Sequence, residues 1–129
     1  MKTNTAKTVL RIIYGALLAF FGLNGILQFM PLPQPTPEAG EFMGALAKTG
    51  YIFPIVSILE ALVGVLLLIN RYTALALVLV FPIILNAFLM HLFLDLPGIG
   101  GSLIALVLNI TLFVMYKNNY ESVFQLKAT

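Results

Sequence analysis

The chain has 129 residues, of which 60% are hydrophobic and 9% are charged, and its formal net charge is +2. Soluble domains carry about 25% charged residues, so this composition excludes an ordinary soluble domain and indicates a membrane protein. The small net charge, with no basic stripe, excludes a nucleic-acid interface. The absence of cysteine excludes thiol, disulfide, iron–sulfur and cysteine–zinc chemistry by this chain itself.

Charged residues divide the chain into four apolar segments. Three of the segments contain no Asp, Glu, Lys or Arg, and the remaining one contains only Glu60. A helix of about 20 apolar residues spans a bilayer core about 30 Å thick. We therefore predict an all-α, polytopic membrane protein: a single domain, residues 1–129, that forms an antiparallel bundle of four transmembrane helices. The predicted spans are residues 9–29, 51–69, 72–94 and 98–116.

The first apolar segment, residues 12–30, follows three basic residues and could be mistaken for a signal peptide. It is longer than the signal core of about 7–15 residues, and no small-x-small motif precedes Pro31, so we expect a retained helix. Six of the seven basic residues would lie on one side of four spans, and the positive-inside rule then places both termini in the cytoplasm, with the chain in the inner (cytoplasmic) membrane. These residues are Lys2, Lys7, Arg11, Arg71, Lys117 and Lys127.

The one long connection, residues 31–50, is predicted to be extended in its proline-rich first half and helical in its second half. Thr36 can cap the helix, Pro37 suits its first position and Gly50 can close it. Phe42, Met43 and Leu46 would share one face, which predicts a short amphipathic helix in the first outer loop. Two interpretations remain open: a connector packed on the rim of the bundle, or a lid over an outward-facing cavity.

Glycines in the first span suggest close contacts between helices. Gly15, Gly22 and Gly25 lie on similar faces, and small residues let membrane helices approach closely. Whether these contacts form within one bundle or between protomers is left open. Pro82, inside the third span, is expected to kink that helix or to free a carbonyl one turn earlier.

Glu60 is the most unusual residue of the sequence. It lies near the middle of the second span, and no Lys or Arg shares its depth. A carboxylate near the bilayer centre costs at least a few kcal/mol unless it is paired or protonated, so we expect a neutral acid that donates a hydrogen bond. Two interpretations remain open: an interhelical hydrogen bond that fixes the bundle, or a group that binds a ligand or a proton.

Further polar side chains lie in the outer half of the predicted bundle: Asn24, Gln28, Asn86 and His91. With Glu60 they could converge on one outward-facing polar pocket that binds a ligand. His91 and Asp95 are four residues apart, so one helix face carries both. Asn109, in the fourth span, is expected to form an interhelical hydrogen bond.

The sequence predicts no metal site, because it has one histidine, no cysteine and no paired-ligand spacing. A haem on His91 would need a second ligand or an open site. No glycine-rich phosphate loop, nucleophile triad or HExxH motif occurs. We therefore assign no catalytic residue and expect no independent enzymatic turnover.

Several short segments together carry a resemblance to a known family. They are Phe21–Gly25 in the first span, Leu59–Leu68 with Glu60 and Gly64 in the second, Asn70-Arg71-Tyr72 at the inner turn, and Asn86–His91 followed by Leu92-Phe93-Leu94-Asp95. In their order and spacing, over about residues 8–116, the chain resembles the DoxX-like family of small four-helix membrane proteins.

The resemblance implies a bundle in the cytoplasmic membrane and an association with thiosulfate:quinone oxidoreductase or other membrane oxidoreductases. It favours a non-catalytic subunit of a redox system that binds a quinone-like or lipid ligand, with Glu60 and Asn86 as hydrogen-bonding groups and His91 as a proton relay. The alternative is a carrier, scaffold or transporter-like protein for a lipid or small solute. The expected partners are the bilayer and a membrane or peripheral redox protein, which would dock at residues 31–50 or after Tyr116. Whether the chain also forms a homo-oligomer is left open.

Overall fold

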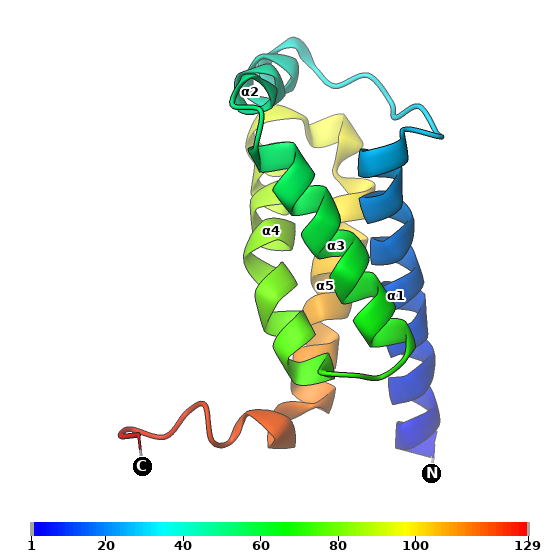
Figure 1. Cartoon of the computed structure of the whole chain (residues 1–129), viewed down its shortest axis with the longest axis vertical. Helices are drawn as coiled ribbons and strands as arrows, with labels where there is room; N and C mark the ends of the chain where they lie inside the picture. The colour runs from blue at the N-terminus through cyan, green and yellow to red at the C-terminus, as the bar shows by residue number, and fades with distance from the viewer. Residues whose placement is uncertain (1, 129) are drawn as a thin grey trace.

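The computed structural model describes residues 2–128 (Figure 1), and within that range it contains helices and no strand, so the all-α prediction is confirmed. The α-helices are α1 (Lys2–Leu27), α2 (Pro37–Lys48), α3 (Ile52–Leu68), α4 (Thr73–Leu94) and α5 (Gly100–Met115). Two short 3-10 helices follow α4 and α5: η1 (Leu96–Gly98) and η2 (Lys117–Tyr120).

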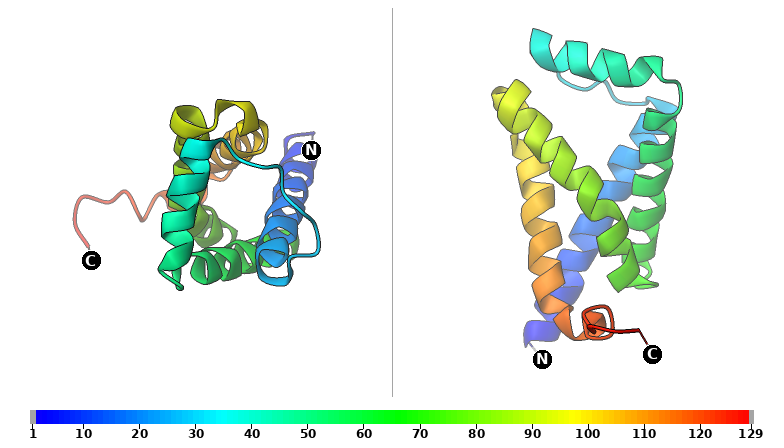
Figure 2. Two further views of the ribbon diagram at one scale, coloured as in Figure 1. Left: turned by 90° about the horizontal axis from the view of Figure 1, so that it is seen from above. Right: turned by 90° about the vertical axis from the view of Figure 1, so that its left-hand side faces the viewer.

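Four of the α-helices stand side by side, with α1 next to α3, α3 next to α4, α4 next to α5, and α5 next to α1 (Figure 2). The chain runs alternately up and down through them. Both ends of the chain lie at one end of the bundle, which we call the inner end, and α2 lies across the opposite, outer end (Figure 1). This arrangement agrees with the predicted antiparallel bundle and with a helix in the loop after the first span.

Helix lengths decide how many membrane spans the structure offers. Two helices, over Asn4–Leu27 and Thr73–Leu94, are long and apolar enough to cross a membrane. Helices α2 and α3 pass the same test only as a pair, and they are bent by 94° at the break between them. Helix α5 is apolar but has 16 residues, about 24 Å of helix. The described chain therefore gives two or three spans by this measure, and the predicted count of four is not confirmed.

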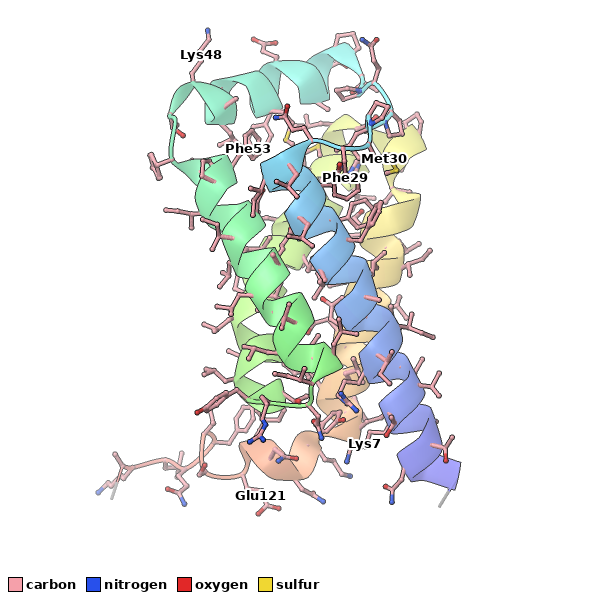
Figure 3. The ribbon with its side chains drawn as sticks, turned by 45° about the vertical axis from the view of Figure 1, so that its right-hand side comes forward. Lys7, Phe29, Met30, Lys48, Phe53 and Glu121 are labelled. Atoms are coloured by element: carbon pink, nitrogen blue, oxygen red, sulfur yellow. The ribbon has the colours of Figure 1, made fainter. Side chains whose placement is uncertain are left out.

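Large apolar side chains project outward along the length of the bundle, as expected for helices in contact with lipid. Exposed examples from the four long helices are Ile13, Leu23, Ile58, Leu62, Leu75, Leu79, Ile104 and Val107. Charged side chains gather at the two ends instead: Figure 3 shows Lys7 and Glu121 at the inner end and Lys48 at the outer end. This distribution is compatible with insertion into a membrane.

The contact between α1 and α3 is the most extensive in the bundle. A Cβ atom added at Gly22 would lie 2.3 Å from the Ala61 nitrogen, and one added at Gly64 would lie 2.3 Å from the Ala19 nitrogen. Neither helix has room for a side chain at these points, so the two backbones touch. The close contacts that the glycines predicted are thus confirmed, and they form within one chain.

Arg11 holds the inner end of this helix pair. Its guanidinium group donates hydrogen bonds to the carbonyls of Leu67 and Leu68, the last two residues of α3. Those carbonyls have no partner within the helix, and a cation is favourable at the negative end of the helix dipole. Arg11 is buried, so it is a capping residue of α3 as well as one of the basic residues at the inner end.

At the outer end, Thr36 joins the connection to the end of α4. Its side chain accepts a hydrogen bond from the Ala39 N–H at 3.3 Å and so caps α2, as predicted. Its hydroxyl donates to the Leu94 carbonyl, and its backbone N–H donates to Asp95 Oδ1 at 3.4 Å. The start of α2 is therefore attached to the rim of the bundle.

Candidate functional site

Glu60 lies on the face of α3 that is turned toward the interior of the bundle. Val63, Gly64 and Leu67, one and two turns along that face, are buried. Glu60 itself is only half-buried, so part of the residue remains accessible. Within residues 2–128 no hydrogen bond or ion pair joins its carboxyl group to another residue. The acid therefore faces the core with its hydrogen-bonding capacity unused.

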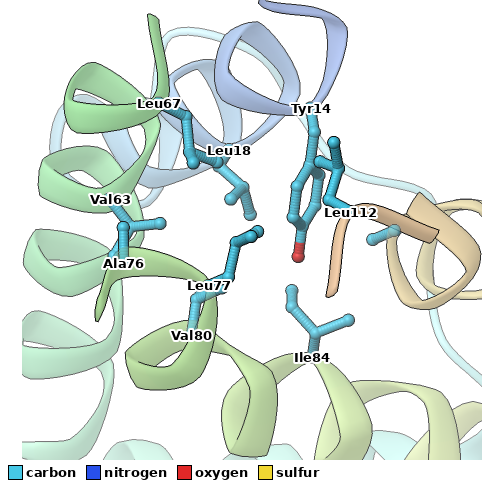
Figure 4. Close-up of a cluster of buried hydrophobic side chains, with 10 residues drawn as sticks. Tyr14, Leu18, Val63, Leu67, Ala76, Leu77, Val80, Ile84 and Leu112 are labelled. Carbon is cyan, nitrogen blue, oxygen red and sulfur yellow. The ribbon is translucent and has the colours of Figure 1, made fainter. Parts of the chain in front are cut away.

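Tyr14 of α1 and Asn109 of α5 place two more polar groups in the interior, and both residues are 0% exposed. Asn109 Nδ2 donates a hydrogen bond to the Tyr14 hydroxyl at 2.7 Å. Glu60 is close enough to Tyr14 to act on it electrostatically. Figure 4 shows the Tyr14 hydroxyl pointing into the apolar cluster toward Leu77 and Ile84. We call Glu60, Tyr14 and Asn109, from three different helices, the interior polar group.

The hydrogen bonds of the interior polar group are incomplete. Asn109 Oδ1 is buried and has no hydrogen-bond partner in the described part of the chain. A buried acceptor left unpaired costs about 1–3 kcal/mol, and native structures rarely tolerate this without a functional or structural reason. The interhelical hydrogen bond predicted for Asn109 is confirmed, but it satisfies only the amide nitrogen. The oxygen remains able to accept a hydrogen bond from a ligand or from water.

Asn24 and Gln28 lie together near the outer end of α1, where they help to line a hollow of about 490 Å³. The Asn24 side chain is buried and serves the local backbone: it donates to the Met30 carbonyl at 3.0 Å and accepts from the Met30 N–H at 2.8 Å. Gln28 is exposed and has a φ of 52°, which ends the helix. Neither forms a hydrogen bond with Glu60 in the described chain, so these two residues belong to a local turn and its adjoining hollow.

Asn86 points away from the interior, and its predicted convergence with Glu60 is not what the structure shows. It is exposed, and its Nδ2 donates to the Pro82 carbonyl of its own helix at 2.9 Å. Ile84 is buried, and Asn86 lies about 200° from it around α4. The position of Asn86 along its helix was readable from the sequence, but the direction in which it points was not. A ligand contact for Asn86 stays a prediction.

His91 and Asp95 form the pair that their spacing predicted, with His91 Nδ1 3.1 Å from Asp95 Oδ2. Asp95 is buried, and it also accepts the hydrogen bond from the Thr36 N–H. A Cβ atom added at Gly98 would lie 2.6 Å from Asp95 Oδ2, so the following turn closes tightly over the carboxylate. This pair therefore attaches the outer connection to α4. Among residues 2–128 no group of three His, Asp or Glu side chains could hold a metal ion.

Tyr14 is the interior residue that the sequence interpretation missed. Its position inside an apolar span was a usable signal, because a tyrosine hydroxyl buried in an apolar environment normally requires a hydrogen-bond partner. The partner, Asn109, is 95 residues away and could not be identified from spacing. Glu60 was identified correctly as an unusual residue, and its helix face turns it toward the same interior as Tyr14.

The chain matches no protein-family model, no curated protein and no solved structure. Its candidate site therefore rests on the geometry of Glu60, Tyr14 and Asn109 inside an apolar helical bundle.

Proposed function

We propose that this chain is a four-span protein of the cytoplasmic membrane, with both termini in the cytoplasm, that binds the polar head of a quinone-like or lipid amphiphile at the interior polar group. We further propose that it acts as a non-catalytic subunit of a membrane redox system. The observation that carries the proposal is Glu60: a carboxyl group on the interior face of an apolar helix, accessible in part and without a hydrogen-bond partner in the described chain.

The lengths of α3 and α5 are compatible with four spans if their flanking residues are included. Helix α3 has 17 residues and α5 has 16, so each falls only a few residues short of the usual 20. Both carry large exposed apolar side chains, such as Ile58 and Ile104, on their outward faces. Because α3 and α5 pack against α1 and α4 in the same bundle, a bilayer that accepts α1 and α4 would also surround α3 and α5.

The interior polar group has the composition of a site for an amphiphile. Such sites are mostly apolar and contain a few polar groups that fix the orientation of the ligand. Here the carboxyl of Glu60, the phenol of Tyr14 and the amide of Asn109 are the polar groups. Apolar side chains that include Leu77 and Ile84 surround them. A ligand with a polar head and an apolar body would match both parts.

The redox association comes from the resemblance to the DoxX-like family. The chain has no cysteine and a single histidine, which is already paired with Asp95. We therefore place the electron donor or acceptor on a partner protein. Helix α2 and the segment after Tyr116 lie outside the four-helix bundle, and we propose them as the docking regions.

Native mass spectrometry of protein extracted gently from its own membrane tests the proposal. We expect a bound small molecule on the native protein, retention of that molecule by Glu60→Gln, and weaker retention by Glu60→Ala. The matched control is Glu41→Gln, which changes an exposed glutamate of α2. Equal retention by both Glu60 variants would show that Glu60 is not a ligand contact. Lipid or solute flux in liposomes without a redox partner would instead favour a carrier.

A further inference from the structure

The pairing of Tyr14 and Asn109 leaves a specific set of hydrogen-bonding groups unused. Their 2.7 Å bond uses one amide N–H of Asn109 and one lone pair of the Tyr14 oxygen. Asn109 Oδ1 remains an unpaired acceptor, and the Tyr14 O–H has no acceptor within residues 2–128. The two side chains thus present one donor and one acceptor, and the bond between them holds these within a few ångströms of each other.

Only some chemical groups can satisfy both atoms at once. A carbonyl or ether oxygen can accept from the Tyr14 O–H but can donate nothing to Asn109 Oδ1. A hydroxyl group can do both, since it has one O–H donor and two lone pairs. Water has the same capacity, but it carries no apolar body that could contact the cluster around Leu77 and Ile84.

We infer that the interior polar group selects an amphiphile that bears a hydroxyl group, with Tyr14 donating to its oxygen and Asn109 Oδ1 accepting its proton. This inference rests on the proposed function and specifies the ligand class of the same site. Glu60 is partly exposed, whereas Tyr14 and Asn109 are 0% exposed. Glu60 is therefore the member of the group that a ligand can meet first, and Asn109 is the residue that distinguishes a hydroxyl from its ether, because only the hydroxyl can donate to Asn109 Oδ1.

Two probes of nearly equal size separate this selection from apolar affinity. The probes are 4-nonylphenol and its methyl ether, added at equal mole fraction to lipid nanodiscs that contain the full-length chain. The fraction of protein that carries each probe is measured by native mass spectrometry. We expect the phenol to bind about fivefold more tightly than the ether, because only the phenol can donate the hydrogen bond to Asn109 Oδ1.

Asn109→Leu should abolish that ratio, because it removes the acceptor that only the phenol can use. Tyr14→Phe should weaken the binding of both probes and leave most of the ratio in place, because both probe oxygens can accept from the Tyr14 O–H. Tyr72→Phe is the matched control, since Tyr72 is 74% exposed, and it should leave the ratio unchanged. The two probes are compared as a ratio of affinities because the same folded fraction of the protein binds both. A variant that is less stable therefore binds less of each probe without a change in this ratio.

The possible failures are distinguishable. Saturable binding of both probes with equal affinity would overturn the hydroxyl selection and leave the proposed amphiphile site standing. A preference for the ether would also overturn it, and would mean that the Asn109 amide turns its nitrogen toward the ligand. Saturable binding of neither probe, together with no ligand on the native protein, would overturn the inference and the proposed function together.

Discussion

The Asn109 amide donates a hydrogen bond to the Tyr14 hydroxyl at 2.7 Å and so joins the first and the last α-helix of the bundle across 95 positions of sequence. Both side chains are completely buried among apolar residues. In an environment without water, neither group has an alternative partner of equal quality. The bond therefore contributes to both the orientation of α1 against α5 and the polarity of the interior.

A double-mutant cycle measures this bond. We expect Tyr14→Phe to lower the free energy of unfolding by about 1–2 kcal/mol, because it leaves the Asn109 amide without a partner. Asn109→Leu should cost a similar amount, since it leaves the Tyr14 hydroxyl unpaired. The double variant should be less destabilised than the sum of the two, because no polar group then remains unpaired. Unfolding in mixed detergent micelles, followed by circular dichroism, gives the three values.

Tyr72→Phe serves as the control for the cycle, and it should change the free energy of unfolding by less than about 0.5 kcal/mol because Tyr72 is exposed. Strictly additive effects of Tyr14→Phe and Asn109→Leu would show that the two side chains do not interact in the folded protein.

Gly64 tests the contact between α1 and α3. Its added Cβ would lie 2.3 Å from the Ala19 nitrogen, a backbone atom that cannot move without shifting α1. We expect Gly64→Ala to lower the free energy of unfolding by about 1–3 kcal/mol. Gly44→Ala is the matched control, because nothing lies within 4 Å of its added Cβ and Gly44 is inside helix α2. That change should be neutral or stabilise by up to about 1 kcal/mol. Equal effects of the two substitutions would contradict the backbone contact.

The arrangement of the helix ends can be tested in cells, because the chain has no cysteine of its own. Single cysteines at the exposed positions Asn4 and Glu121 should be protected from a membrane-impermeant maleimide in intact cells. Cysteines at Gln34 and Glu41, at the outer end, should be labelled. After the cells are lysed, all four should react. If the cysteines at positions 4 and 121 were both labelled from outside, the proposed orientation would be wrong. If only one of the two were labelled, the chain could not cross the membrane an even number of times.

Much of the architecture was predictable from local patterns. Four apolar segments gave four bundle helices, and the Thr36 cap, the Pro37 start and the pairing of His91 with Asp95 all followed from short-range spacing. The close contact through Gly22 and Gly64 also followed, because only residues without side chains permit it. The predicted number of four spans is not confirmed, since α5 ends at Met115 after only 16 residues.

The candidate site was predictable only in part. Glu60 was identified because a carboxyl group is costly in an apolar segment wherever it points. Asn86 was expected in the interior but faces outward from α4, because the residue number indicates only a position along the helix, whereas direction depends on which helix packs against which face. Asn24 is buried, but its side-chain amide forms hydrogen bonds with the Met30 backbone and, within the described chain, none with Glu60.

The sequence by itself determined that the chain is helical and apolar, that its charges lie at the ends of its helices, and that one acid interrupts an apolar segment. These properties depend on composition and on contacts within a few residues, which the order of residues specifies directly. Only the tertiary structure decided that Tyr14 meets Asn109, that Arg11 caps α3 and that Asn86 faces outward. Those relationships depend on the rotation of each helix about its axis, which is fixed when all the helices bury their apolar faces and touch at their glycines together.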